Sequence, residues 1–72
     1  MLKYQKTVEV YKRLSFKQSW VESSTETSMV EVENDQALIT SGVKLITTIG
    51  GYKQIELSSD TLTKTVTYFK RL

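Results

Sequence analysis

Residues 2–16 have the sequence LKYQKTVEVYKRLSF, and the alternation within this stretch decides the fold class. Its even positions are mostly apolar, in the order Leu, Tyr, Lys, Val, Val, Lys, Leu and Phe, whereas its odd positions are polar except for Tyr11. A period of two places alternate side chains on opposite faces of an extended backbone. A helix is disfavoured because Thr7, Val8 and Val10 are β-branched and lose side-chain freedom in a helix. We therefore predict a long strand over residues 2–16.

Two shorter strands are predicted next, over residues 18–23 and 28–33. The second alternates valine with glutamate, which is typical of a strand with one buried face. The polar stretch 22–28 is expected to form an exposed loop or a hairpin tip. Asn34-Asp35 tolerates a positive φ at both positions, so we predict a two-residue turn there, within a hairpin of about residues 28–40.

Two further hairpins are predicted in the second half of the chain. Gly50-Gly51 is a two-residue turn signal between a strand over 43–49 and a strand over 52–57. Ser58-Ser59-Asp60 is the next turn signal, and threonine then falls at alternate positions from 61 to 67. In this last hairpin the alternation places polar and apolar side chains on opposite faces.

The predicted fold is therefore mainly β: a single domain over residues 1–72, built as a small antiparallel sheet or barrel of about five to seven short strands. The alternative is an α+β fold with a C-terminal helix near 59–72, with or without a second helix over 36–49. Apolar residues in both segments also follow a helical spacing. Their high content of β-branched residues favours strands.

Catalytic chemistry has little support in the composition. The chain has no cysteine and no histidine, which excludes disulfides, thiolate nucleophiles, zinc fingers and histidine bases. Glu31 and Glu33 alternate with valines, a pattern that indicates a solvated strand face rather than an acid–base pair. The acidic stretch that follows does not match a calcium-binding loop, because Gln36 and Gly42 stand where that loop needs glycine and glutamate. We predict a protein that is not an enzyme and has no cofactor, metal or small-molecule substrate.

The N-terminus lacks the apolar core of a signal peptide, and the longest aliphatic run is Ala37-Leu38-Ile39. We therefore expect a cytoplasmic protein without a membrane partner.

Charge and aromatic residues suggest a nucleic-acid partner. Residues 1–20 carry five basic residues and one acidic residue, whereas residues 21–35 carry five acidic residues and no basic one. Basic residues alternate with aromatic residues near both ends of the chain, as in small β domains that bind single-stranded nucleic acid. Tyr4, Phe16 and Trp20 fall on the apolar parity and are expected in the core. The residues predicted to bind nucleic acid are Tyr11, Lys12, Arg13, Lys17, Lys70 and Arg71.

A protein partner or a homo-oligomer, such as a homodimer, is the alternative prediction. If the Gly50-Gly51 hairpin forms, Leu45 and Ile49 share a face with polar Gln54. The strand over 43–49 is then apolar on both faces, and such a strand is either buried on both faces or packs against another subunit. The predicted interface consists of Val43, Leu45, Ile49 and Tyr52, or of the acidic segment 22–35. An accessory factor of a phage or mobile element that acts on a host protein is one example of this class.

Overall fold

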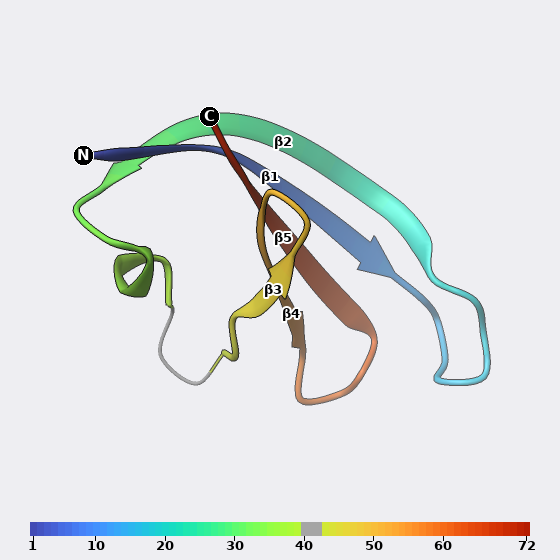
Figure 1. Cartoon of the computed structure of the whole chain (residues 1–72). Helices are drawn as coiled ribbons and strands as arrows, with labels where there is room; N and C mark the ends of the chain where they lie inside the picture. The colour runs from blue at the N-terminus through green and yellow to red at the C-terminus, as the bar shows by residue number, and fades with distance from the viewer. Residues whose placement is uncertain (40–42) are drawn as a thin grey trace.

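The computed structural model describes residues 1–39 and 43–72, which form five strands and one short 3-10 turn. The strands are antiparallel and lie side by side in the order β2-β1-β5-β4-β3 (Figure 1). The mainly-β prediction is confirmed, and the sheet is open rather than closed into a barrel. In chain order the elements are β1 (Leu2–Lys12), β2 (Val21–Val32), η1 (Asp35–Leu38), β3 (Ile46–Thr48), β4 (Gly51–Leu57) and β5 (Thr63–Arg71).

Strand β1 has the alternation that its sequence predicts, although it ends at Lys12 rather than at residue 16. It pairs with β2 on one side and with β5 on the other, so that Tyr4 lies between Val30 and Arg71. Tyr4 is fully buried, which confirms its place in the core. The even residues of β1 therefore define an inner face of the sheet, and its odd residues define an outer face.

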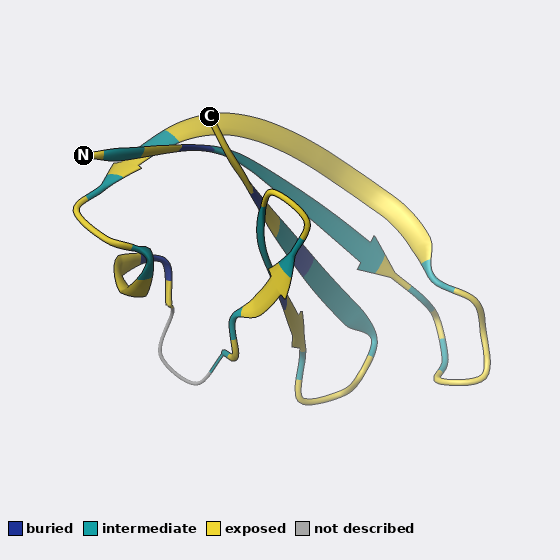
Figure 2. Cartoon of the chain, viewed as in Figure 1, coloured by how far each residue is buried: buried dark blue, intermediate teal, exposed yellow. Residues whose placement is uncertain are grey.

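The core lies between the inner face and η1, which sits beneath the curved sheet (Figure 2). Tyr4, Leu38 and Phe69 form its centre, and the Tyr4 and Phe69 rings meet edge to face with centroids 6.3 Å apart. Such aromatic pairs contribute about 0.5–1.5 kcal/mol beyond the area that they bury. The partly buried residues packed around this centre are Leu2, Val30, Val32, Leu45 and Tyr52.

The predicted turn at Asn34-Asp35 and its hairpin over residues 28–40 are wrong. Asn34 is instead the N-cap of η1, where its side chain accepts a hydrogen bond from the Ala37 amide at 3.3 Å. The Asp35 side chain accepts hydrogen bonds from Tyr4 and Tyr52 across the core. Asparagine suits an N-cap as well as a turn, and these long-range contacts favour the cap.

The predicted pair of strands at 18–23 and 28–33 is also incorrect, because residues 21–32 form the single strand β2. The stretch 22–28 lies within this strand rather than in a loop, and its residues pair with β1. The connection between β1 and β2 spans residues 13–20 and carries Phe16, which is 69% exposed rather than in the core. Pairing with β1, rather than an alternation of apolar residues, therefore defines this edge strand.

The hairpin between β3 and β4 forms, but its turn is Ile49-Gly50, because Thr48 pairs with Gly51. Gly50 adopts the φ of 80° that this turn requires. The Gly51 Cα lies so close to β5 that an added Cβ would be 1.8 Å from the Phe69 carbonyl oxygen.

The hairpin between β4 and β5 is shifted by two residues from the predicted register, so that Ile55 pairs directly with Val66. The Ser58 amide closes a longer loop by donating to the Thr63 carbonyl at 2.9 Å. The shift keeps the predicted separation of polar and apolar side chains, but Gln54 is 5% exposed on the inner face rather than in solvent.

Both helical alternatives are wrong for the described residues. Residues 63–71 of the proposed C-terminal helix form strand β5, which has a partner on each side. Within 36–49, the described residues contain the end of η1 and strand β3, and residues 40–42 lie outside the described part of the chain. Cross-strand pairing here outweighs the helical spacing of the apolar residues.

The open sheet leaves much of the molecule exposed. Its accessible surface is 5260 Å², compared with about 4,600 Å² for a compact monomer of this mass. Its radius of gyration is 13.3 Å, compared with about 11 Å for a compact chain of this length. The excess surface follows from a sheet whose outer face has no second layer. Over residues 1–39 and 43–72, no helix has the length and apolar character needed to cross a membrane.

Candidate functional site

The outer face of the sheet combines exposed apolar side chains with lysines. The odd residues of β1 share this face with Lys64, Val66, Tyr68 and Lys70 of β5, as the strand register requires. The apolar residues of this face that remain more than one-third exposed are Met29, Ile46, Ile55, Leu57 and Tyr68. An uncovered face of this composition is typical of a binding surface.

Cross-strand pairing arranges the outer face in rows. Tyr68 lies between Thr7 and Lys53, and its side chain is 40% exposed. Two rows further along this face, beyond the row of Glu9, Val66 and Ile55, Lys64 lies between Tyr11 and Leu57. The Tyr68 row and the Lys64 row each place one aromatic ring beside one ammonium group.

A basic-aromatic cluster, formed by Tyr11, Arg13, Trp20 and Lys64, lies at one end of this face. The Arg13 guanidinium lies 4.0 Å from the centroid of the Trp20 ring. The Lys64 ammonium is 5.0 Å from the Tyr11 ring and 5.0 Å from the Trp20 ring. Cation–π contacts of this kind contribute about 0.5–1 kcal/mol each at exposed sites. The contacts therefore hold two cations and two rings in a fixed arrangement.

The loop between β4 and β5 positions Arg13 for this contact. The Arg13 backbone amide donates to the Leu62 carbonyl at 3.1 Å, and its side-chain Nε donates to the Thr61 carbonyl at 2.9 Å. The Asp60 carboxylate in turn accepts from the Leu62 amide at 2.9 Å. Hydrogen bonds from the Ser58 hydroxyl and the Leu62 amide lower the pKa of Asp60 because they favour its charged form.

Tyr11 is held neutral within the cluster. Its hydroxyl donates to the Glu9 carboxylate at 3.0 Å. This hydrogen bond and burial raise the pKa of Tyr11 above its ordinary value. Glu9 lies on the same face, where its carboxylate accepts this hydrogen bond and keeps its negative charge.

The structure brings together only some of the residues predicted to bind nucleic acid. Tyr11 and Arg13 belong to the basic-aromatic cluster, and Lys17 lies 5.8 Å from the Phe16 ring in the adjacent connection. Lys12 lies on the inner face, where it lines a hollow of about 440 Å³.

Lys70 and Arg71 lie at the far end of β5. Arg71 lies eight residue steps along the strand from Thr63, which places it about 26 Å from the cluster end of β5. Arg71 is on the inner face near Asp35, whereas Lys70 is on the outer face.

Four residues of the outer face were not predicted as site residues: Trp20, Lys53, Lys64 and Tyr68. Trp20 was expected in the core because its position was assigned to a strand rather than to a connection. The alternation of residues 63–71 was enough to place Lys64 and Tyr68 with Ile55 and Leu57. The sequence pattern did not indicate that the face of β4 with Ile55 and Leu57, which is the more apolar face, is the one left uncovered.

The alternative interface of Val43, Leu45, Ile49 and Tyr52 does not form one surface. Leu45 and Tyr52 pack against the core, and Val43 lines a pocket on the inner face. Ile49 is fully exposed at the tip of the turn between β3 and β4.

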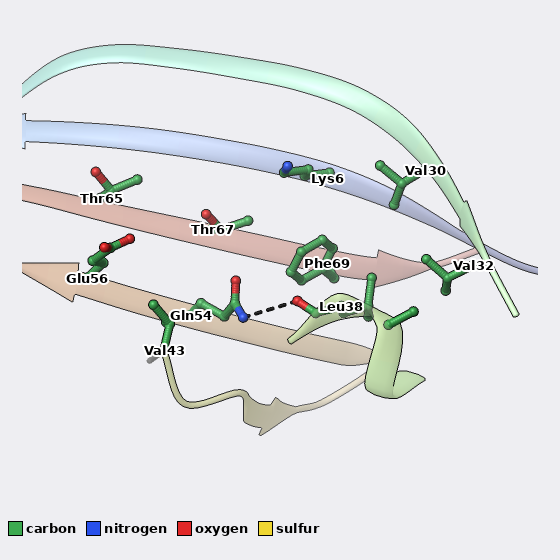
Figure 3. A pocket seen from close by; sticks show the side chains of 11 residues that line it. Lys6, Val30, Val32, Leu38, Val43, Gln54, Glu56, Thr65, Thr67 and Phe69 are labelled. Carbon is green, nitrogen blue, oxygen red and sulfur yellow. Dashed lines mark hydrogen bonds between the residues drawn. The ribbon is translucent and has the colours of Figure 1, made fainter. Parts of the chain in front are cut away.

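The inner-face pocket has a volume of about 250 Å³ and mixed chemistry (Figure 3). Phe69 and Leu38 form its apolar end, and the side-chain amide of Gln54 closes it by donating to the Leu38 carbonyl at 3.1 Å. Lys6 and Glu56 line it from strands that flank β5. The hydrogen bond in this pocket secures the end of η1 against β4, so we assign the pocket a structural role.

A clasp of Tyr4, Asp35 and Tyr52 holds η1 against the sheet. Both tyrosine hydroxyls donate to the Asp35 carboxylate, one to each oxygen. These hydrogen bonds lower the pKa of Asp35, whereas the bond to Asp35 raises the pKa of Tyr4 and of Tyr52. Both hydroxyls and both carboxylate oxygens of the clasp are engaged in these hydrogen bonds, so we assign it a structural role.

Among the described residues, no three carboxylates lie close enough together to hold a metal ion. No family model, curated protein or solved structure matches the chain.

Proposed function

We propose that this protein is a non-catalytic module that binds single-stranded nucleic acid across the outer face of its sheet. The observation that carries the proposal is the arrangement of Trp20 and Tyr68 beside Arg13, Lys64 and Lys53 on an uncovered sheet. Aromatic rings stack on unpaired bases while lysines and arginines contact the phosphates.

The distribution of charge supports this use of the outer face. Strands β1, β4 and β5 present four lysines there, and Glu9, the carboxylate among them, is bonded to Tyr11. The acidic residues of β2 lie along one edge of the sheet. A polyanion is therefore drawn to the β5 and β4 side and repelled from the β2 side. The lysines are Lys3, Lys53, Lys64 and Lys70.

Tyr68 offers the most accessible ring in the middle of this path. A base can stack on a ring in a sheet only when it is not stacked within a duplex, so the surface suits single strands. Each stacked base contributes about 1–3 kcal/mol. The guanidinium of Arg13, fixed against Trp20, supplies a second plane of the kind on which bases also stack. Strand β5 has nine residues and spans about 30 Å, so the occupied site is short.

Fluorescence anisotropy with a labelled twelve-nucleotide oligothymidylate tests the proposal at several salt concentrations. Tyr68→Ala and Lys53→Glu are each expected to weaken binding about tenfold, equivalent to about 1.4 kcal/mol. Each phosphate contact adds about −0.7 to the slope of log affinity against log salt, so Lys53→Glu also makes that slope less steep by this amount.

Lys12→Glu is the matched control, because it makes the same charge change on the inner face at the cluster end of β1. It is expected to bind nearly as well as the unmodified protein. No binding at low salt, or an equal loss for Lys12→Glu and Lys53→Glu, would contradict the use of the outer face.

A further inference from the structure

We propose that the free edge of β2 is a docking site for an extended basic segment of another protein, which adds to the sheet as a sixth, antiparallel strand. Strand β2 stands at one end of the sheet, so its edge away from β1 has no strand beside it in the described structure. The nine consecutive residues Val21–Met29 are all exposed. Such an edge presents unpaired backbone donors and acceptors that another strand can bind.

This edge has only part of the protection that normally prevents added pairing. Proteins protect edge strands with charged side chains, above all lysine, with inward-pointing charges, and with proline, short length or bulges. Of these, β2 has glutamates, with Glu26 on the inner face, and one bulge. Strand β2 has twelve residues without a lysine or a proline, and most of them are threonine, serine or valine. Its one irregularity in register lies opposite Val10 and Tyr11, which leaves residues 24–32 in unbroken register with β1. The opposite edge, β3, has only three residues.

Charge on β2 selects a basic partner. The strand carries Glu22, Glu26 and Glu31, and Glu33 follows it directly. The Lys3 ammonium is 3.9 Å from Glu31, and both side chains are mostly exposed, so this pair is a weak interaction. Opposite charges on paired strands stabilise the pairing, and like charges destabilise it.

The same carboxylates disfavour a second copy of this chain as the partner. Antiparallel pairing of β2 with itself would gather six strand carboxylates along one seam. With Thr27 opposite its own copy, for example, the two Glu26 side chains become diagonal neighbours about 7–8 Å apart. An extended segment with lysine or arginine on both of its faces avoids this repulsion. Glu26 shares the inner side with Val30, whereas Glu22 and Glu31 lie on the outer side.

The docking site lies along the edge of the sheet rather than on its outer face, and it meets the proposed nucleic-acid surface where Glu22 pairs with Tyr11. The acidic edge repels phosphates, and the lysines of the outer face repel a basic peptide. Because the partner strand lies in the plane of the sheet, both ligands have room on the protein at the same time.

Amide hydrogen exchange of the full-length, isotope-labelled protein tests the inference. The probe is an acetylated ten-residue peptide that repeats Lys-Lys-Thr-Thr, which places lysine on both faces of the added strand. Saturating peptide is expected to slow exchange of alternate β2 amides, those that point outward, by at least about tenfold. The amides of β4 and β5 are expected to be unchanged. The same peptide carrying N-methyl groups along its pairing edge keeps its charge but loses its backbone donors, and it should give no protection.

Two carboxylate variants test whether the peptide binds at the β2 edge or responds only to negative charge anywhere on the protein. Glu26→Lys should weaken peptide binding at least about fivefold. Glu56→Lys makes the same charge change on the inner face of β4 and should leave binding unchanged.

Each of three results would overturn the inference. If the N-methylated peptide binds equally well, charge attraction alone accounts for the binding and no strand is added. Peptide-induced shifts on the outer face would place the site elsewhere. Protected outward amides in the free protein, together with a doubled mass in sedimentation, would identify a second copy as the occupant.

Discussion

Replacing Gly51 by alanine tests how closely β4 approaches β5 beside the core. The added Cβ would lie 1.8 Å from the carbonyl oxygen of Phe69 and 2.9 Å from its carbonyl carbon. Both are backbone atoms that cannot rotate away. The strands must move apart by about 1.2 Å before the Cβ–oxygen distance reaches the 3.0 Å limit of real contacts.

The cost of that movement can be worked out from the contacts around Gly51. The Arg71 amide donates to the Gly50 carbonyl at 2.9 Å, and Gly51 itself pairs with Lys70. Loss of about two backbone hydrogen bonds at 0.5–1.5 kcal/mol each, with about 1 kcal/mol of residual overpacking, gives a destabilisation of about 3 kcal/mol. The 72 residues imply a total stability of about 4–11 kcal/mol, so this is a large fraction.

Gly50→Ala is the matched control because Gly50 has the unusual backbone conformation but ample space. Its φ is 80°, and no atom lies within 4 Å of an added Cβ. The left-handed conformation costs alanine about 1–2 kcal/mol, and the stiffer unfolded chain offsets about 0.4–1 kcal/mol of this. Urea unfolding followed by circular dichroism measures both variants. If Gly51→Ala is no less stable than Gly50→Ala, the close approach of the strands is refuted.

Two further predictions concern the clasp and the basic-aromatic cluster. Because its folded-state pKa is lowered, Asp35 stabilises the fold above its unfolded pKa of about 3.9, and this stabilisation is lost as the pH falls through the lowered pKa. Tyr4 and Tyr52 have raised pKa values, so their contribution is complete below their unfolded pKa of about 10 and is lost as the pH rises through the folded values. The measurement is the urea midpoint of unfolding at a series of pH values. In Asp35→Asn the midpoint should fall less at acidic pH than in the unmodified protein, and an equal fall in both proteins would contradict the role of Asp35 in the clasp. Arg13→Ala removes both the cation–π contact with Trp20 and the hydrogen bond to the Thr61 carbonyl, so it should cost about 1–2.5 kcal/mol. It should also shift Trp20 emission to the red, because the ring loses the guanidinium at 4.0 Å; an unshifted spectrum would show that the two side chains do not stack.

Strand β1 was predictable from sequence because its buried face requires apolar residues at alternate positions. Pairing on both sides holds the strand in the extended conformation that this alternation predicts. The alternation of residues 2–12 agrees with the burial of Tyr4, and the parity of 52–57 against 63–71 is also as predicted. Turn residues were less informative, since Ser58, Ser59 and Asp60 fit several loop lengths. A shift of two residues in register keeps the parity, so the pattern of polarity does not distinguish the two arrangements.

The edge strand and the outer face were harder to predict, for a physical reason. A strand that is exposed on both faces has no buried side to impose a period, so residues 22–28 resemble a loop. The two faces of β4 were distinguished by polarity, yet the clasp and the hydrogen bond from Gln54 to the Leu38 carbonyl make the more polar face the covered one. Hydrogen bonds between residues 16 or more positions apart are not visible in a local pattern.

The length difference between the two edge strands explains why this sheet remains open, and why β2 keeps a free edge. Closure into a barrel would have to pair β2 with β3, which have twelve and three residues. Such a pairing satisfies at most a quarter of the β2 edge, and it would bend the sheet around a core centred on only three buried side chains. The chain therefore gains little from closure and retains one long acidic edge beside one basic face. The two binding surfaces that we propose, which are opposite in charge, both depend on this open architecture.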